Sequence, residues 1–219
     1  MDNNIIEAIE NEPDFKLLKK VPEHFLNQEA DNSEPNFIAA IIDLETMGLN
    51  SNKDEIIEIG IIWLYFNKSS GLLSIKETYN TLQEPSMPIP AEITKITGIT
   101  NEDVKGQSID WQFVNQLLKE THLVICHNSQ FDRNFLENQT PLEIKATITN
   151  MAFACTIKDI NWNERGFESS KLDYLNFKLG YFYDGHRALN DCFATLNLLT
   201  QEKGAFEELK DNVKKKEIL

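Results

Sequence analysis

The chain has 219 residues, of which 41% are hydrophobic and 26% charged, and its acidic and basic side chains give a net charge of −14. This size and composition favour one domain with an appendage and a sizeable apolar core. The acidity argues against a protein that coats nucleic acid electrostatically. The longest apolar runs, residues 37–42 and 60–66, are far shorter than the roughly 20 residues of a membrane helix, so we expect no membrane association.

The start of the sequence and its cysteines predict a cytoplasmic location. The first residues are acidic and lack an apolar segment, so we expect no signal peptide. Cys126, Cys155 and Cys192 are odd in number and lack metal-ligand spacing. We therefore expect reduced thiols rather than a disulfide framework.

Residues 1–36 differ from the rest because they are strongly acidic: nine acidic residues against three lysines give a net charge of −6. We predict a marginal helix packed on the domain, followed by a polar linker at Asn32–Asn36. A partly disordered tail is the alternative, given the charge. The apolar stripe expected on this helix consists of Phe15, Leu17, Leu18, Val21 and Phe25.

Three strands are predicted at the start of the central region. Residues 37–42 form a continuous apolar run, and residues 55–66 are rich in isoleucine and aromatic side chains. A turn at 68–71 leads to a third strand over 72–81. Connections this short are typical of an antiparallel meander.

The following elements alternate between helix and strand. A short helix begins at Pro90 and ends at Gly98, Ser108 caps the next helix, residues 122–126 form a buried strand, and 130–138 are helical. Residues 142–157 are ambiguous, and we read a strand and then a helix. Ser170 is expected to cap a helix to Leu179, and further helices cover 187–202 and the C-terminal tail. This order predicts a mixed sheet flanked by helices.

Asp43 and Glu45 follow the first strand. Alternate residues of an extended chain point to the same side, so both carboxylates converge. Two neighbouring carboxylates repel each other unless a cation lies between them, and a hard divalent ion prefers oxygen ligands. An ordinary solvated strand end is the alternative.

Asp132 lies just after the strand at 122–126, near the edge where open α/β sheets collect ligands. It can equally be a first-turn acid that the helix dipole favours. We interpret Phe131 as a core residue rather than a stacking platform. We interpret Asn128 as a turn residue rather than a ligand.

His186 precedes the helix at 187–202, and Asp191 lies in the second turn of that helix. Histidine suits general-base work because its ordinary pKa lies near neutrality. Taken alone, His186 is more often an exposed or capping residue.

Together these segments resemble one family, the DEDDh 3′→5′ exonucleases, which include polymerase proofreading subunits and oligoribonucleases. The family's three motifs match DLETMGL (43–49), HNSQFD (127–132) and HRALND (186–191), and its I-T-G-I segment resembles residues 96–99. The spacing from His186 to Asp191 selects the histidine subgroup over the tyrosine subgroup. Met47 departs from the threonine of many members and bears on specificity. The resemblance covers roughly residues 37–203.

The resemblance implies a ribonuclease-H-like mixed sheet and a set of functional residues. Two Mg²⁺ or Mn²⁺ ions would be held by four carboxylates, and His186 would take a proton from the attacking water. Contacts to the 3′-terminal nucleotide would come from the first-motif loop and the second motif. The implied metal ligands are Asp43, Glu45, Asp132 and Asp191, and the implied substrate contacts are Thr46, Met47, Leu49 and Asn128.

The expected protein is thus an acidic extension (1–36), an exonuclease domain (37–203) and a C-terminal helical tail (204–219). The favoured substrate is the 3′ end of single-stranded DNA, in proofreading or repair, with a polymerase or other protein as a further partner. An enzyme for RNA or short oligonucleotides is the alternative. A catalytically idle binding module is the rival from another class, and the complete set of five residues speaks against it.

Overall fold

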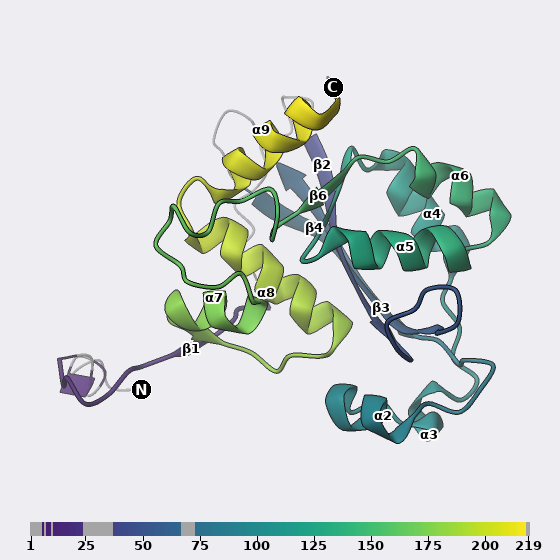
Figure 1. Cartoon of the computed structure of the whole chain (residues 1–219), viewed down its shortest axis with the longest axis horizontal. Helices are drawn as coiled ribbons and strands as arrows, with labels where there is room; N and C mark the ends of the chain where they lie inside the picture. Colours follow the sequence, from purple (N-terminus) through teal and green to yellow (C-terminus); the bar gives the residue numbers. More distant parts are fainter. Residues whose placement is uncertain (1–5, 7, 10, 24–36, 67–72, 218–219) are drawn as a thin grey trace.

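A five-stranded mixed sheet lies at the centre of the computed structural model, which describes residues 6, 8–9, 11–23, 37–66 and 73–217. Helices cover both faces of the sheet (Figure 1). The strand order is β4-β3-β2-β5-β6, in which β2, β3 and β4 are antiparallel and β5 and β6 run parallel to β2. The predicted fold class is therefore confirmed. The strands are β2 (Phe37–Thr46), β3 (Ile56–Phe66), β4 (Leu73–Leu82), β5 (Leu123–Cys126) and β6 (Phe153–Cys155).

The helices form two layers and a small peripheral group (Figure 1). One layer contains α4 (Trp111–Glu120), α5 (Ser129–Gln139) and α6 (Leu142–Thr149). The other contains α7 (Leu172–Lys178), α8 (Ala188–Gln201) and α9 (Ala205–Glu217). The short helices α2 (Ala91–Thr97) and α3 (Asn101–Val104) lie beyond one end of the sheet.

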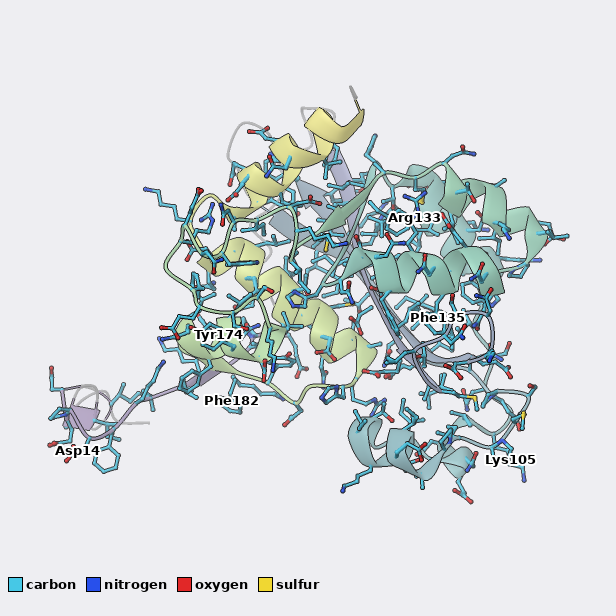
Figure 2. The ribbon with its side chains drawn as sticks, in the orientation of Figure 1. Asp14, Lys105, Arg133, Phe135, Tyr174 and Phe182 are labelled. Carbon is cyan, nitrogen blue, oxygen red and sulfur yellow. The ribbon has the colours of Figure 1, made fainter. Side chains whose placement is uncertain are left out.

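The two helical layers bury alternate residues of β2. Ala39 and Ile41 belong to the cluster with α8 and α9, whereas Ala40 and Ile42 belong to the cluster with α4, α5 and α6. Phe135 of α5 is fully buried in this second layer (Figure 2). The period of two along a strand fixes these faces, and it directs residues 43 and 45 toward α8.

α8 packs unusually closely on the sheet because Gly60 of β3 has no side chain. A Cβ placed on Gly60 would lie 2.5 Å from the backbone of Ala188 and of Leu189. The neighbouring thiol of Cys192 contacts the Gly60 carbonyl oxygen at 3.3 Å. This contact fixes the first turn of α8 against β3.

The described part of the N-terminal extension is extended rather than helical over its predicted stripe. β1 (Lys19–Lys20) pairs in parallel with β7 (Tyr181–Phe182), and Val21 is buried in the core. Phe15 is 68% exposed, and Asp14 lies away from the sheet (Figure 2). The helix prediction is therefore wrong there, because backbone pairing with β7 replaced an apolar stripe. Phe25 and the predicted linker lie outside the described residues.

Three local predictions are also wrong. Residues 142–157 form helix α6 and then strand β6, the reverse of the predicted order, because Pro141 supplies the start of a helix. α4 is capped by Asp110, whose side chain accepts the Phe113 amide, and not by Ser108. α7 begins after Lys171 with no side-chain cap, and not at Ser170.

The three cysteines are free and buried, as expected of reduced thiols. In the part of the chain that the structure describes, no helix combines the length and apolar character needed to cross a membrane.

Candidate active site

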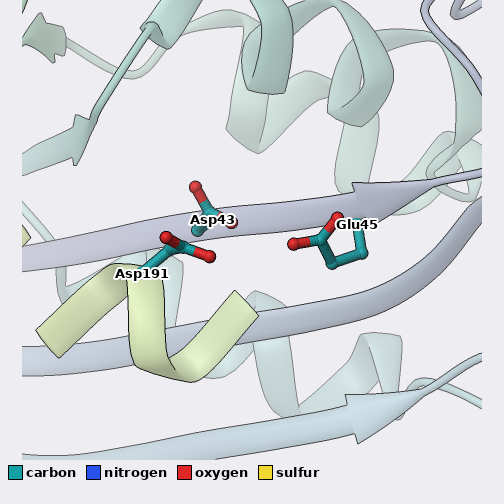
Figure 3. Close-up of side chains that lie close together, drawn as sticks. All are labelled: Asp43, Glu45 and Asp191. Carbon is teal, nitrogen blue, oxygen red and sulfur yellow. The ribbon is translucent and has the colours of Figure 1, made fainter. Parts of the chain in front are cut away.

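Three carboxylates from distant parts of the chain meet at one point. Asp43 and Glu45 project from β2, and Asp191 projects from the first turn of α8, one turn earlier than the sequence predicted (Figure 3). One oxygen of each side chain lies within 4.8 Å of the others. The convergence follows from the strand alternation of β2 and the close packing of α8 at Gly60.

Asp132 lies beside this group but outside the set of three. It occupies the first turn of α5 and is buried. The Leu44 amide and the Cys126 thiol lie close to its carboxylate and favour the charged form, so both act against the rise of its pKa. These contacts fix Asp132 near β2, where its charge acts on Asp43.

The four carboxylates hold their protons more tightly than free side chains. Burial is the largest cause for each, and the neighbouring acids add to it for Asp43 and Glu45. The pKa rises to about 8 for Glu45, about 7 for Asp132 and about 6 for Asp191, and that of Asp43 is raised well above its usual range. Such a group of buried, mutually repelling oxygens is compatible with a divalent cation.

A cleft of about 680 Å³ opens onto these carboxylates. His186 is exposed at this cleft, and Asn128 and Lys171 also line it. His186 and Asn128 both have positive φ angles, 61° and 108°. Non-glycine residues in this region are uncommon and persist where the surroundings hold them, often at functional sites.

Two polar residues that sequence reasoning did not single out support the cleft. Burial raises the pKa of Tyr183 and the neighbouring Asp191 adds to this rise, so the phenol stays protonated beside that carboxylate. The His127 ring lies 2.7 Å from the Thr156 hydroxyl through Nδ1, and burial lowers its pKa to about 4. His127 is therefore neutral at physiological pH and holds the start of the second motif.

The predicted substrate contacts of the first-motif loop lie in different surroundings. The Thr46 hydroxyl is buried and donates to the Gly48 carbonyl at 2.6 Å. Met47 packs against an apolar cluster that includes Ile57. Leu49 is 87% exposed. The loop therefore presents Leu49 to solvent and holds Thr46 and Met47 inward.

We predict that the metal-free protein loses stability as the pH rises from about 4 to about 8. Each raised pKa means that the folded chain keeps a proton that the unfolded chain has released, so folding stability falls across this window. Thermal unfolding in EDTA should therefore show a lower Tm at pH 8 than at pH 5.5. Mn²⁺ should restore the Tm at pH 8, because it binds only the folded site.

An Asp43→Asn/Glu45→Gln variant is the control for this pH dependence. It lacks two of the titrating groups, so its Tm should change less with pH and respond less to Mn²⁺. A wild-type Tm in EDTA that is constant or increases over this window would contradict the prediction.

The comparisons with known proteins define the family. The family model RNase_T, described as an exonuclease, matches residues 40–199. The chain belongs to this exonuclease family, and its relatives are consistent with the DEDDh 3′→5′ group.

Among curated proteins, the chain is similar to a DNA polymerase III PolC-type protein of Clostridium perfringens, with 27% identity over 79% of this chain and 11% of the relative. It is also 27% identical to the DNA polymerase III subunit epsilon of Aquifex aeolicus, over 72% of this chain and 76% of the relative. The chain thus spans only a small part of the PolC-type relatives.

Two solved structures share the fold. Escherichia coli exonuclease I in complex with an oligonucleotide superimposes with a TM-score of 0.60 at 18% identity, over 81% of this chain and 44% of that one. Exonuclease X in complex with 5′ overhanging duplex DNA gives 0.55 at 22% identity, over 80% and 99%. The expected ribonuclease-H-like sheet is that of these proteins.

Proposed function

We propose that this protein is a metal-dependent 3′→5′ exonuclease that hydrolyses terminal phosphodiesters of nucleic acid to nucleoside 5′-monophosphates. One observation carries the proposal. Asp43, Glu45 and Asp191, which are far apart in the sequence, bring their carboxylate oxygens within 4.8 Å of one another beside an open cleft.

The carboxylates would hold two divalent cations, Mg²⁺ or Mn²⁺, with Asp132 as the fourth ligand. When bound, such ions neutralise the phosphodiester and stabilise both the attacking and the leaving oxygen of an in-line displacement. The donor set fits hard cations because it consists of carboxylate oxygens. Tyr183 lines the cleft with Asp191 and stays protonated, so its hydroxyl is available to that carboxylate as a donor.

His186 is proposed as the general base. Its ring is exposed in the same cleft as the carboxylates, which is the position that a base for the attacking water requires. The proton leaves the water as the oxygen attacks phosphorus, and the leaving 3′-oxygen stays on the shortened strand.

The terminal nucleotide would lie between the first-motif loop and the start of α5. Leu49 and Asn128 are exposed and available to it, whereas Thr46 and Met47 act through the shape of the loop. Lys171 lies in the cleft and suits a phosphate of the strand by charge.

We favour single-stranded DNA as substrate, in proofreading or repair in the cytoplasm, with a polymerase as partner. The names of the PolC-type and epsilon relatives support this choice. RNA or short oligonucleotides are the alternative, since a chain with a net charge of −14 is suited to few phosphate contacts.

The test follows the shortening of 5′-labelled DNA and RNA of matched sequence, together with the release of mononucleotides. With Mg²⁺ or Mn²⁺, the DNA should shorten stepwise from its 3′ end faster than the RNA, and EDTA should stop the reaction. A 3′-blocked oligonucleotide is the substrate control. Faster degradation of RNA would support the alternative substrate, and no release from either strand with both metals would refute the nuclease function.

A further inference from the structure

An ion pair between the buried Glu58 and the partly exposed Arg187 joins β3 to the segment that carries His186. Glu58 of β3 is 0% exposed, and it is the one charged residue of that strand. The Arg187 guanidinium donates to both Glu58 oxygens, with Nη2–Oε1 at 2.8 Å and Nε–Oε2 at 3.0 Å. Such a two-pronged contact fixes orientation as well as distance.

The same carboxylate holds the first turn of α8. The Ala188 amide donates to Glu58 Oε2 at 3.0 Å, and the Asn80 side chain donates to Oε1 at 3.3 Å. α8 has no side-chain cap of its own at Arg187. Glu58, which lies in β3, therefore takes the place of the missing N-terminal cap of α8. Its negative charge suits the positive end of the helix.

Arg187 connects this ion pair directly to the proposed active site. The Arg187 backbone amide donates to Asp191 Oδ2 at 3.2 Å. His186 immediately precedes Arg187 and has a φ of 61°. A strained backbone of this kind persists only where neighbouring contacts fix it.

We propose that Glu58 is a positioning residue: through Arg187 and the first turn of α8, it sets Asp191 and His186 against Asp43 and Glu45. Glu58 makes no contact with substrate in this role. It acts by holding β3, α8 and the His186 segment in one geometry. The inference rests on the proposed function, whose reaction it serves.

The test compares Glu58→Gln with Glu208→Gln. Glu208 pairs with Arg165 through Oε2 at 2.8 Å and lies outside the cleft, so its variant reports the loss of a similar ion pair elsewhere. Glu58→Gln should lower kcat by about 10–100-fold, the usual range for groups that orient metal ligands. The KM for the oligonucleotide should change little, and Glu208→Gln should keep the wild-type kcat.

Two measurements without substrate separate positioning from general stability. Glu58→Gln should bind Mn²⁺ about 10–100-fold more weakly in calorimetry, and hydrogen exchange of the Ala188 amide should accelerate. Glu208→Gln should show neither change. Wild-type kcat and Mn²⁺ affinity in folded Glu58→Gln would overturn the proposal, as would equal losses in both variants.

A second variant covers the case in which Glu58→Gln does not fold. The Arg187 side chain is 44% exposed, so Arg187→Lys keeps the charge and loses only the two-pronged contact. It should lower kcat and Mn²⁺ affinity in the same direction, and unchanged values would overturn the proposal. A wild-type protein without nuclease activity would refute the proposed function, whereas weaker Mn²⁺ binding by the variants would still support positioning.

Discussion

Replacing Asp43 by asparagine is expected to abolish exonuclease activity and to stabilise the metal-free protein at neutral pH. Burial raises the pKa of Asp43, and four neighbouring acids raise it further, namely Asp132, Asp191, Glu45 and Glu58. Removing its charge relieves this repulsion. The same change removes a proposed metal ligand, and a loss of several kcal/mol of transition-state stabilisation corresponds to roughly 10³-fold or more in rate.

The measurements are mononucleotide release with Mn²⁺ and the Tm in EDTA at pH 7.5. Asp110→Asn is the matched control, because Asp110 caps α4 outside the cleft and asparagine caps helices equally well. That variant should keep both activity and Tm. Wild-type activity in Asp43→Asn would contradict the metal assignment, and a lower Tm in EDTA would contradict the repulsion.

Replacing His186 by alanine is expected to lower kcat by about 10²–10⁴-fold, the usual range for loss of a general base. Because a general base takes a proton from the attacking water, the pH dependence of the rate should differ between the wild type and the variant. Mononucleotide release over a range of pH at saturating Mn²⁺ measures both effects.

Mn²⁺ affinity distinguishes a base from a ligand. His186→Ala should bind Mn²⁺ as tightly as the wild type, since His186 does not belong to the group of side chains that could hold a metal ion. His122→Ala is the control, because His122 accepts the Ile38 amide at 3.1 Å and does not line the cleft. An unchanged pH–rate profile in His186→Ala would remove His186 from the base role.

The sequence predicted the convergence of Asp43 and Glu45 because the period of a strand is a local property. It also placed Asp191 on the final helix of the domain. What brings Asp191 to β2 is the close approach of α8 at Gly60, which depends on contacts distant in the sequence. The motif resemblance predicted that Asp191 lies near Asp43 and Glu45. Strand periodicity alone does not predict it.

Glu58 and Tyr183 were missed for the same reason. A charged residue within the apolar run 56–66 was a visible signal, since a buried carboxylate requires a partner. The sequence did not identify that partner as Arg187, which lies 129 positions away. The error over residues 142–157 is different, because a short apolar segment does not distinguish a strand from a helix.

Because β2 and α8 are far apart in the sequence, the proposed site can form only after both have been synthesised. Asp43 is synthesised well before Asp191. Domains form as units during synthesis, and contacts between distant residues form only after both have been made. A growing or truncated chain that ends before α8 therefore carries Asp43, Glu45 and Asp132 without Asp191. The carboxylate cluster of the proposed active site cannot be assembled before α8 has been translated.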